Sequence, residues 1–240
     1  MASSYTTNTG LELVTTGEKA GLWGGITNTN LQILEQSATG YLSVDMAGAS
    51  VTLTLTDGST SNGKNIYLRL YGTLAANRTL TMPATANRVW IVKDETVRGA
   101  SNRTLGVLTA SGSTTTQIPP GATVLCRSNG SETDVTIIEK GYATITDSNS
   151  PYTTVAGAQI FANTTSNPIT LNLPASPAVG DEVTIIDTRG TFQSNNLTVG
   201  RNGQPINSAA SDLTLNTNGQ AITVVYVDAT RGWAYKTNTA

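Results

Sequence analysis

The stretch GEKAGLWGGITNTNLQILEQ, residues 17–36, organises this chain, because it is the only segment with helical spacing and it precedes every predicted strand. Leu31, Ile33 and Leu34 form an apolar stripe, Thr27 or Asn28 is a suitable N-cap, and Gly40 follows the last periodic residue. This pattern predicts a short helix of about two to three turns. A helix of that length is marginal alone in water, so its stripe is expected to dock on its own β domain or on another chain.

The same region resembles the N-terminal segment of structural proteins from tailed phages, commonly of marine and cyanobacterial phages, that are described as tail fibre or virion structural proteins. The resemblance is carried by Leu11–Leu13, Gly17–Glu18, Gly21–Gly24 and Thr27–Leu31, and it is close over about the first 45 residues. A looser resemblance to cyanophage fibre and appendage proteins lies in Pro174–Val183 with the distal Gly232–Trp233. The resemblance implies a virion protein and leaves its position in the particle open.

Composition restricts the class of protein. At 240 residues the chain has room for one large or two modest β domains. Charged residues make up only 12% of the chain and the formal net charge is −2, which argues against binding to nucleic acid or to an anionic membrane. Low charge also favours surfaces packed against copies of the same chain, which would hide strand edges. The resemblance to phage fibre and appendage proteins, which are commonly trimeric, implies that the assembly is a homotrimer.

Cysteine and histidine usage restricts the chemistry. Cys126 is the one cysteine, so no intrachain disulfide forms, and the absence of histidine removes the usual zinc sites and Ser-His-Asp triads. The N-terminus lacks the basic and apolar regions of a secretory signal, and no run approaches 18 apolar residues. We expect a protein made in the cytoplasm of a bacterial host and located in the virion, with no cofactor and no metal.

From Tyr41 onward the pattern changes to period-two alternation in short runs, such as Val51–Leu55 and Ile66–Tyr71, separated by Gly, Pro, Asn and Ser. This pattern predicts an all-β protein: an N-terminal arm with one short helix, followed by two similar antiparallel domains of the β-sandwich or barrel type. The predicted divisions are 1–40 for the arm and helix, 41–141 for the first β domain and 142–240 for the second.

An internal repeat supports two similar β domains. Leu80–Pro83 is echoed by Leu171–Pro174, with the prolines 91 residues apart (174 − 83), and Val89–Val92 by Val183–Ile186, 94 residues apart (183 − 89). The order of the segments is kept while their spacing drifts, as loop insertions would produce. The alternative is chance, because Thr-, Val- and Leu-rich strands with Gly turns resemble one another.

Candidate catalytic groups are few. Cys126 lies in an apolar strand and is expected in the core. The adjacent carboxylate pairs Asp94–Glu95 and Asp181–Glu182 are weak candidates for glycoside cleavage, because neighbouring residues on a strand point to opposite faces. The three tryptophans are expected in the core or at an interface. Trp23 is bracketed by Gly21 and Gly24, which allow close backbone approach, and therefore suits an anchor that enters a pocket of another subunit.

The sequence therefore predicts a non-enzymatic virion component, first of a tail fibre or appendage. A capsid decoration or cement protein (head fibre) and a carbohydrate-binding or depolymerising tailspike module are the alternatives. Its expected partners are further copies of itself, other phage structural proteins and a host surface glycan. The residues expected to form the virion-attachment interface are Leu11, Leu13, Leu22, Trp23, Leu31, Ile33 and Leu34.

Overall fold

The computed structural model describes residues 3–83, 87–99, 103–109, 111–112, 115–129 and 132–239. The chain divides into two compact units, which are treated separately below. Unit 1 comprises Met1–Val97, Thr104–Ile118 and Thr123–Ile138, and unit 2 comprises Arg98–Arg103, Pro119–Ala122 and Glu139–Ala240. The N-terminal segment, predicted as a region of its own, falls within unit 1 in this division.

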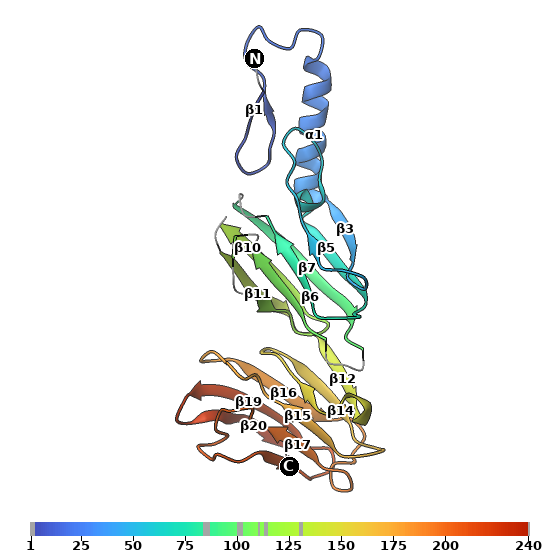
Figure 1. Ribbon diagram of the computed structural model, residues 1–240, viewed down its shortest axis with the longest axis vertical. Helices are drawn as coiled ribbons and strands as arrows, with labels where there is room; N and C mark the ends of the chain where they lie inside the picture. Colours follow the sequence, from blue (N-terminus) through green and yellow to red (C-terminus); the bar gives the residue numbers. More distant parts are fainter. Residues whose placement is uncertain are drawn as a thin grey trace. The chain divides into compact units, whose positions relative to one another are not determined.

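Unit 1 begins with a small hairpin and a helix that extends beyond the sheets (Figure 1). Strand β1 (Ser4–Tyr5) pairs antiparallel with β2 (Glu12–Leu13), and helix α1 runs from Trp23 to Thr39. The predicted N-cap at Thr27 or Asn28 is wrong, since the helix begins at Trp23 and spans 17 residues. The Thr27 hydroxyl instead donates back to the Trp23 carbonyl at 3.0 Å, inside the helix. Tertiary contacts of the helix outweigh the unfavourable glycines of its first turn.

The rest of unit 1 consists of nine strands and a single 3-10 turn, η1 (Asn62–Lys64), among the described residues. The strands are β3 (Tyr41–Asp45), β4 (Val51–Thr52), β5 (Tyr67–Thr73), β6 (Arg78–Met82), β7 (Asn87–Val97), β8 (Leu105–Thr109), β9 (Thr116–Gln117), β10 (Thr123–Asn129) and β11 (Thr133–Glu139).

These strands alternate between two sheets. The order β11-β10-β7-β5-β3 makes one sheet and β4-β6-β8-β9 the other. The pairs β3–β5, β5–β7, β4–β6 and β6–β8 are all parallel. Each turn of the chain therefore contributes one strand to each sheet and stacks on the turn before it. Antiparallel pairing of β9 with β8 and of β10 with β7 ends the stack.

Unit 2 repeats this arrangement. Its strands are β12 (Tyr142–Thr146), β13 (Tyr152–Thr153), β14 (Gln159–Asn163), β15 (Ile169–Asn172), β16 (Glu182–Asp187), β17 (Leu197–Gly200), β18 (Leu213–Leu215), β19 (Ala221–Asp228) and β20 (Gly232–Thr239), with η2 (Asp147–Asn149) after β12. The sheets have the orders β12-β14-β16-β19-β20 and β13-β15-β17-β18. The first three strands of each sheet are parallel, and the later ones are antiparallel.

The prediction of two antiparallel sandwich or barrel domains is therefore wrong. The sheets form a β-solenoid of about six turns, three in each unit, and only the ends of each stack are antiparallel. The all-β class with one α-helix stands for the described residues. The error has a physical reason: period-two alternation reports that one face of a strand is buried, and it is the same whether the neighbouring strand runs parallel or antiparallel.

The cores consist of ladders of apolar side chains from successive turns. In unit 2, Ile160, Ile185 and Ile222 occupy one register row across β14, β16 and β19, and each is at most 1% exposed. The matching row of unit 1 is Leu68, Val92 and Val124, all fully buried. In unit 2 this row belongs to one core that also contains Leu171 and Val199 of the other sheet, so stacked apolar rows from both sheets bury the inner face of each strand.

The two units share their strand order, as the repeat in the sequence predicts. Pro83 and Pro174 both follow the second-sheet strand of the second turn, β6 and β15. The proposed match of Val89 to Val183 is wrong by one residue, because Val89 is exposed whereas Val183 is buried. Trp90, on the inner face of β7, is the residue that corresponds to Val183. Strand β11, which contains Val135, and β20, which contains Trp233, lie at equivalent sheet edges.

Candidate functional site

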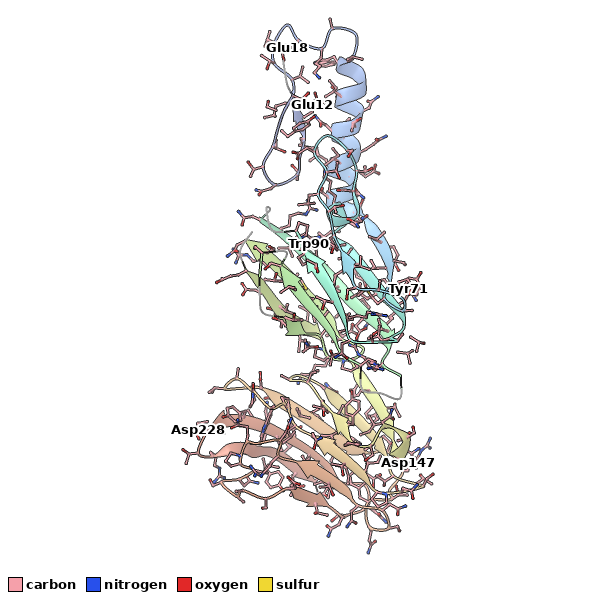
Figure 2. The ribbon with its side chains drawn as sticks, viewed as in Figure 1. Glu12, Glu18, Tyr71, Trp90, Asp147 and Asp228 are labelled. Atoms are coloured by element: carbon pink, nitrogen blue, oxygen red, sulfur yellow. The ribbon has the colours of Figure 1, made fainter. Side chains whose placement is uncertain are left out.

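The hairpin is attached to α1 by one side-chain amide. The Glu12 backbone N–H donates to Asn30 Oδ1 at 2.9 Å, and Asn30 Nδ2 donates to the Glu12 carbonyl at 2.9 Å. Glu12 lies between the hairpin and the helix (Figure 2). Because Asn30 satisfies both backbone groups of one residue, as a strand partner does, it fixes the height of β2 along the helix.

A charged cluster lies beside that contact. Lys19 Nζ is 3.2 Å from Glu12 Oε1, and the Ser3 hydroxyl donates to the same oxygen at 2.6 Å. Hydrogen bonds from Ser3 and then Lys19 hold the pKa of Glu12 below its usual value. A groove of about 310 Å³ lies between the helix and the hairpin, and its lining includes Glu12, Lys19, Leu22, Gly25 and Ile26. Polar and apolar groups share its walls.

The C-terminal part of α1 is joined to the sheets of unit 1. Ile33 is fully buried. Gln36 Nε2 donates to the Ser61 carbonyl at 3.0 Å, and the Ser61 N–H donates to Gln36 Oε1 at 3.2 Å. Gly40 lies where a Cβ would be 2.2 Å from the Gln36 carbonyl, so the close approach at the helix end requires glycine. This half of the helix is part of the folded unit.

The seven predicted attachment residues are not equivalent in the structure. Ile33 is buried in the chain's own core, and Leu11 is half-buried. Leu13 and Leu22 are exposed, and the helix exposes Trp23 by 63%, Leu31 by 58% and Leu34 by 46%. Five large apolar side chains of this segment therefore face solvent in the single chain. Three of them, Trp23, Leu31 and Leu34, lie on α1, and exposed apolar groups gathered on one helix are typical of an interaction surface.

Sequence reasoning missed the aromatic side chains on the outer faces of the sheets. Tyr41, 57% exposed, stacks on Tyr67 with ring centroids 5.5 Å apart. Tyr142 of unit 2, also exposed, stacks on Phe161 at 4.3 Å. Each pair joins the first two strands of its solenoid. The signal in the sequence was an aromatic residue at the start of the first strand in both halves.

The carboxylates of the first candidate pair have separate structural contacts. Asp94 is buried, and its Oδ1 accepts from the Thr96 N–H at 2.9 Å. Glu95 points outward and pairs with Arg69, with Nε 2.6 Å from Oε2. The two carboxylates thus point to opposite faces of β7, which does not suit paired acid catalysis.

The second pair is likewise occupied by its own chain. Asp181 Oδ2 accepts from the Ala178 N–H at 2.8 Å, inside a turn. Glu182 forms ion pairs with Lys236 and Lys140, and the hydrogen bond from Lys236 is the main cause of its lowered pKa. These contacts bind the start of β16 to β20 and to Lys140, two residues before β12.

The remaining candidate groups lie in the core. Trp90 and Trp233 are fully buried, as predicted, and Trp90 Nε1 donates to the Gly63 carbonyl at 2.9 Å (Figure 2). Burial raises the pKa of Cys126 to about 12, which keeps its thiol protonated and confirms it as a core residue. The part of the chain that the structure describes contains no cluster of three metal-ligating side chains. Across those residues no helix is long and apolar enough to cross a membrane.

Comparisons with known proteins leave the family open. No protein-family model and no curated protein matches the sequence. Among solved structures, the chain is similar to one described as "Structure of a chaperone-substrate complex", with a TM-score of 0.36 and 14% sequence identity. The match covers 82% of this chain and 32% of the other, so the chain spans about a third of that structure's length.

Proposed function

We propose that this chain is a non-enzymatic structural component of a tailed-phage virion, in a tail fibre or another tail appendage. Its N-terminal hairpin and helix would attach it to neighbouring proteins, and its two solenoid units would supply rigid length. It would act in the assembled particle, as a homotrimer, without cofactor or metal.

The observation that carries this proposal is the exposure of Leu13, Leu22, Trp23, Leu31 and Leu34 on one short segment. Leaving a Trp and several Leu side chains in water is unfavourable by about 25 cal/mol for each Å² of apolar surface. A protein that assembles recovers this free energy when a partner covers the segment.

The architecture of the two units agrees with a structural role. Each stacked turn contacts mainly the next turn, so a solenoid adds length without requiring a larger core. The carboxylates considered for catalysis are engaged in ion pairs or backbone hydrogen bonds. Strands β3, β11, β12 and β20 end their sheets, and packing against other copies would shield these edges.

The test uses the phage that encodes the chain. Antibody labelling of particles is expected to mark the tail, with a copy number of a few multiples of three. Trp23→Ala is expected to reduce incorporation, because truncating a buried aromatic anchor typically costs about 2 to 4 kcal/mol. The matched control is Val179→Ala, which shortens an exposed side chain of unit 2.

Three results would overturn the proposal. Unlabelled particles would exclude a virion protein. Hundreds of copies on the head would indicate a capsid decoration protein instead. Release of reducing sugar from host envelope polysaccharide by the purified chain would indicate a depolymerising module.

A further inference from the structure

The exposed side of α1 has a regular spacing. Gly24, Thr27, Leu31, Leu34 and Ala38 follow one another at intervals of 3, 4, 3 and 4 residues, which are the a and d positions of a heptad repeat. These five residues are called the seam below. Four of them are exposed and Thr27 is half-buried, so the seam is open along the helix.

The opposite side of the same helix is already used by the chain. Ile26 and Ile33 both occupy c positions of this repeat, and Ile33 is fully buried. Asn30 binds β2 from a neighbouring g position. The hairpin and the sheets therefore hold α1 from one side and leave the seam accessible.

The glycines in the first turn point to a close neighbour. Gly24 and Gly25 weaken the helix relative to alanine, yet a Cβ built at either position meets no atom of the described residues within 4 Å. Gly25 lines the groove beside the hairpin, whereas Gly24 lies on the seam, where no described residue requires its small size. A second backbone or a Trp23 ring packed against Gly24 would require it.

The chemistry of α1 favours another copy of itself as the occupant. Glu35 is the one ionisable residue of the helix, and it lies beside the seam at an e position, so identical helices meet with little charge repulsion. The seam is apolar or small at every position apart from the Thr27 hydroxyl. The pattern typical of a two-stranded coil, a β-branched residue at a with Leu at d, is not met, because position a holds Leu31; the number of strands is taken from the proposed homotrimer.

We infer that α1 forms a parallel three-stranded coiled coil with α1 of two further copies of this chain, through the seam. This inference rests on the homotrimer of the proposed function. It adds that α1 of the other copies covers Leu31 and Leu34. The exposed tip, with Leu13 and Leu22, stays available for other virion proteins.

The first test measures the mass of the purified full chain by sedimentation velocity at micromolar concentration. The wild type is expected to be a trimer. The double variant Leu31→Asn/Leu34→Asn is expected to raise the dissociation constant by roughly 100-fold or more, because it places amides at the a and d layers. Gln32→Asn, on the same helix off the seam, and Val179→Asn, exposed in unit 2, are the matched controls and should leave association unchanged.

The second test fixes the orientation. Leu34→Cys introduces the one accessible thiol, because Cys126 is buried. In a parallel bundle the Leu34 positions of two copies meet, so oxidation with diamide should give covalent dimers. Gln32→Cys should give none. In an antiparallel pair Leu34 would face Thr27, and only the double variant Thr27→Cys/Leu34→Cys would cross-link readily.

The third test uses Gly24→Ala. If the seam faces solvent, alanine stabilises α1 and leaves the mass unchanged; if another helix approaches there, association weakens by about tenfold or more. A monomeric or dimeric wild type, cross-linking of Leu34→Cys no better than Gln32→Cys, or unchanged association in the Asn double variant would each overturn the inference. None of these results depends on where the protein lies in a virion.

Discussion

The segment Leu11–Gln36 divides in the structure into two parts whose removal should affect the stability of unit 1 to different extents. Ile33 and Gln36 belong to the folded body of unit 1, whereas the chain up to Leu22 forms the hairpin and the connection to α1. Ile33→Ala should therefore destabilise unit 1. Deleting residues 3–22 should do so much less.

The magnitude follows from the contacts. Ile33 is 0% exposed, and truncating a buried Ile to Ala typically costs about 2 to 5 kcal/mol, including the cavity that it leaves. Gln36→Ala removes two hydrogen bonds to the Ser61 backbone, worth about 1 kcal/mol each. Deleting through Gln36 should cost roughly 4 to 6 kcal/mol. Deleting only the hairpin frees backbone groups that water can reach, so we expect a loss of about 1 to 2 kcal/mol.

The assay is urea-dependent hydrogen exchange followed by mass spectrometry, which reports unit 1 and unit 2 from separate peptides. Unit 2 serves as the internal reference and should be unchanged in every variant. Gln32→Ala, at an exposed position one residue from Ile33, is the control for helix propensity. The reasoning would be refuted if Ile33→Ala lay within about 0.5 kcal/mol of the wild type, or if the two deletions were equally stable.

Three further predictions concern the cores and the ion pairs. Asp187→Ala should destabilise unit 2 by about 3 to 5 kcal/mol, because four backbone N–H groups donate to this buried carboxylate. The control is Asp212→Ala, which removes one exposed hydrogen bond, and equal losses of stability in the two variants would contradict the expectation. Raising the pKa of Cys126 from 9.0 to about 12 lowers its thiolate fraction about 1,000-fold at pH 8, so maleimide should label it only after unfolding, and rapid native labelling would disprove this. The pKa of Glu182 is lowered in the folded state, so its stabilising effect is present above about pH 4.5 and is lost as pH falls through the folded value. Glu182→Gln should therefore cost under about 1 kcal/mol of stability at pH 7 and nothing near pH 2. A difference in stability between the variant and the wild type near pH 2 would argue against the ion pair with Lys236.

The repeat was visible in the sequence while the direction of the strands was not. Pro83 and Pro174 end equivalent strands, and the two halves share one strand order. The order of the matched segments survives because insertions fall in loops, where they change only the spacing. Alternation reports burial of one face only, and the same apolar set at Leu68 and Leu70 would suit an antiparallel neighbour. The one-residue error at Val89 has a related cause, because an apolar run such as Val89–Val92 conceals which residues point inward.

The candidate site was only partly predictable for a different reason. The sequence placed Leu31, Ile33 and Leu34 on one apolar stripe, yet a helix 17 residues long turns Ile33 toward the sheets and the two leucines toward solvent. The step of about 100° per residue already turns Ile33 away from the side that carries Leu31 and Leu34. The start of the helix was the concealed feature, because Gly24–Gly25 were read as helix breakers. Once the helix is known to begin at Trp23, the residues from Gly24 to Ala38 show the alternating intervals of 3 and 4 that define the seam. Of these two glycines, Gly24 lies on the exposed side of the helix, where none of the described residues requires its small size, so a neighbour packed on that side would account for it.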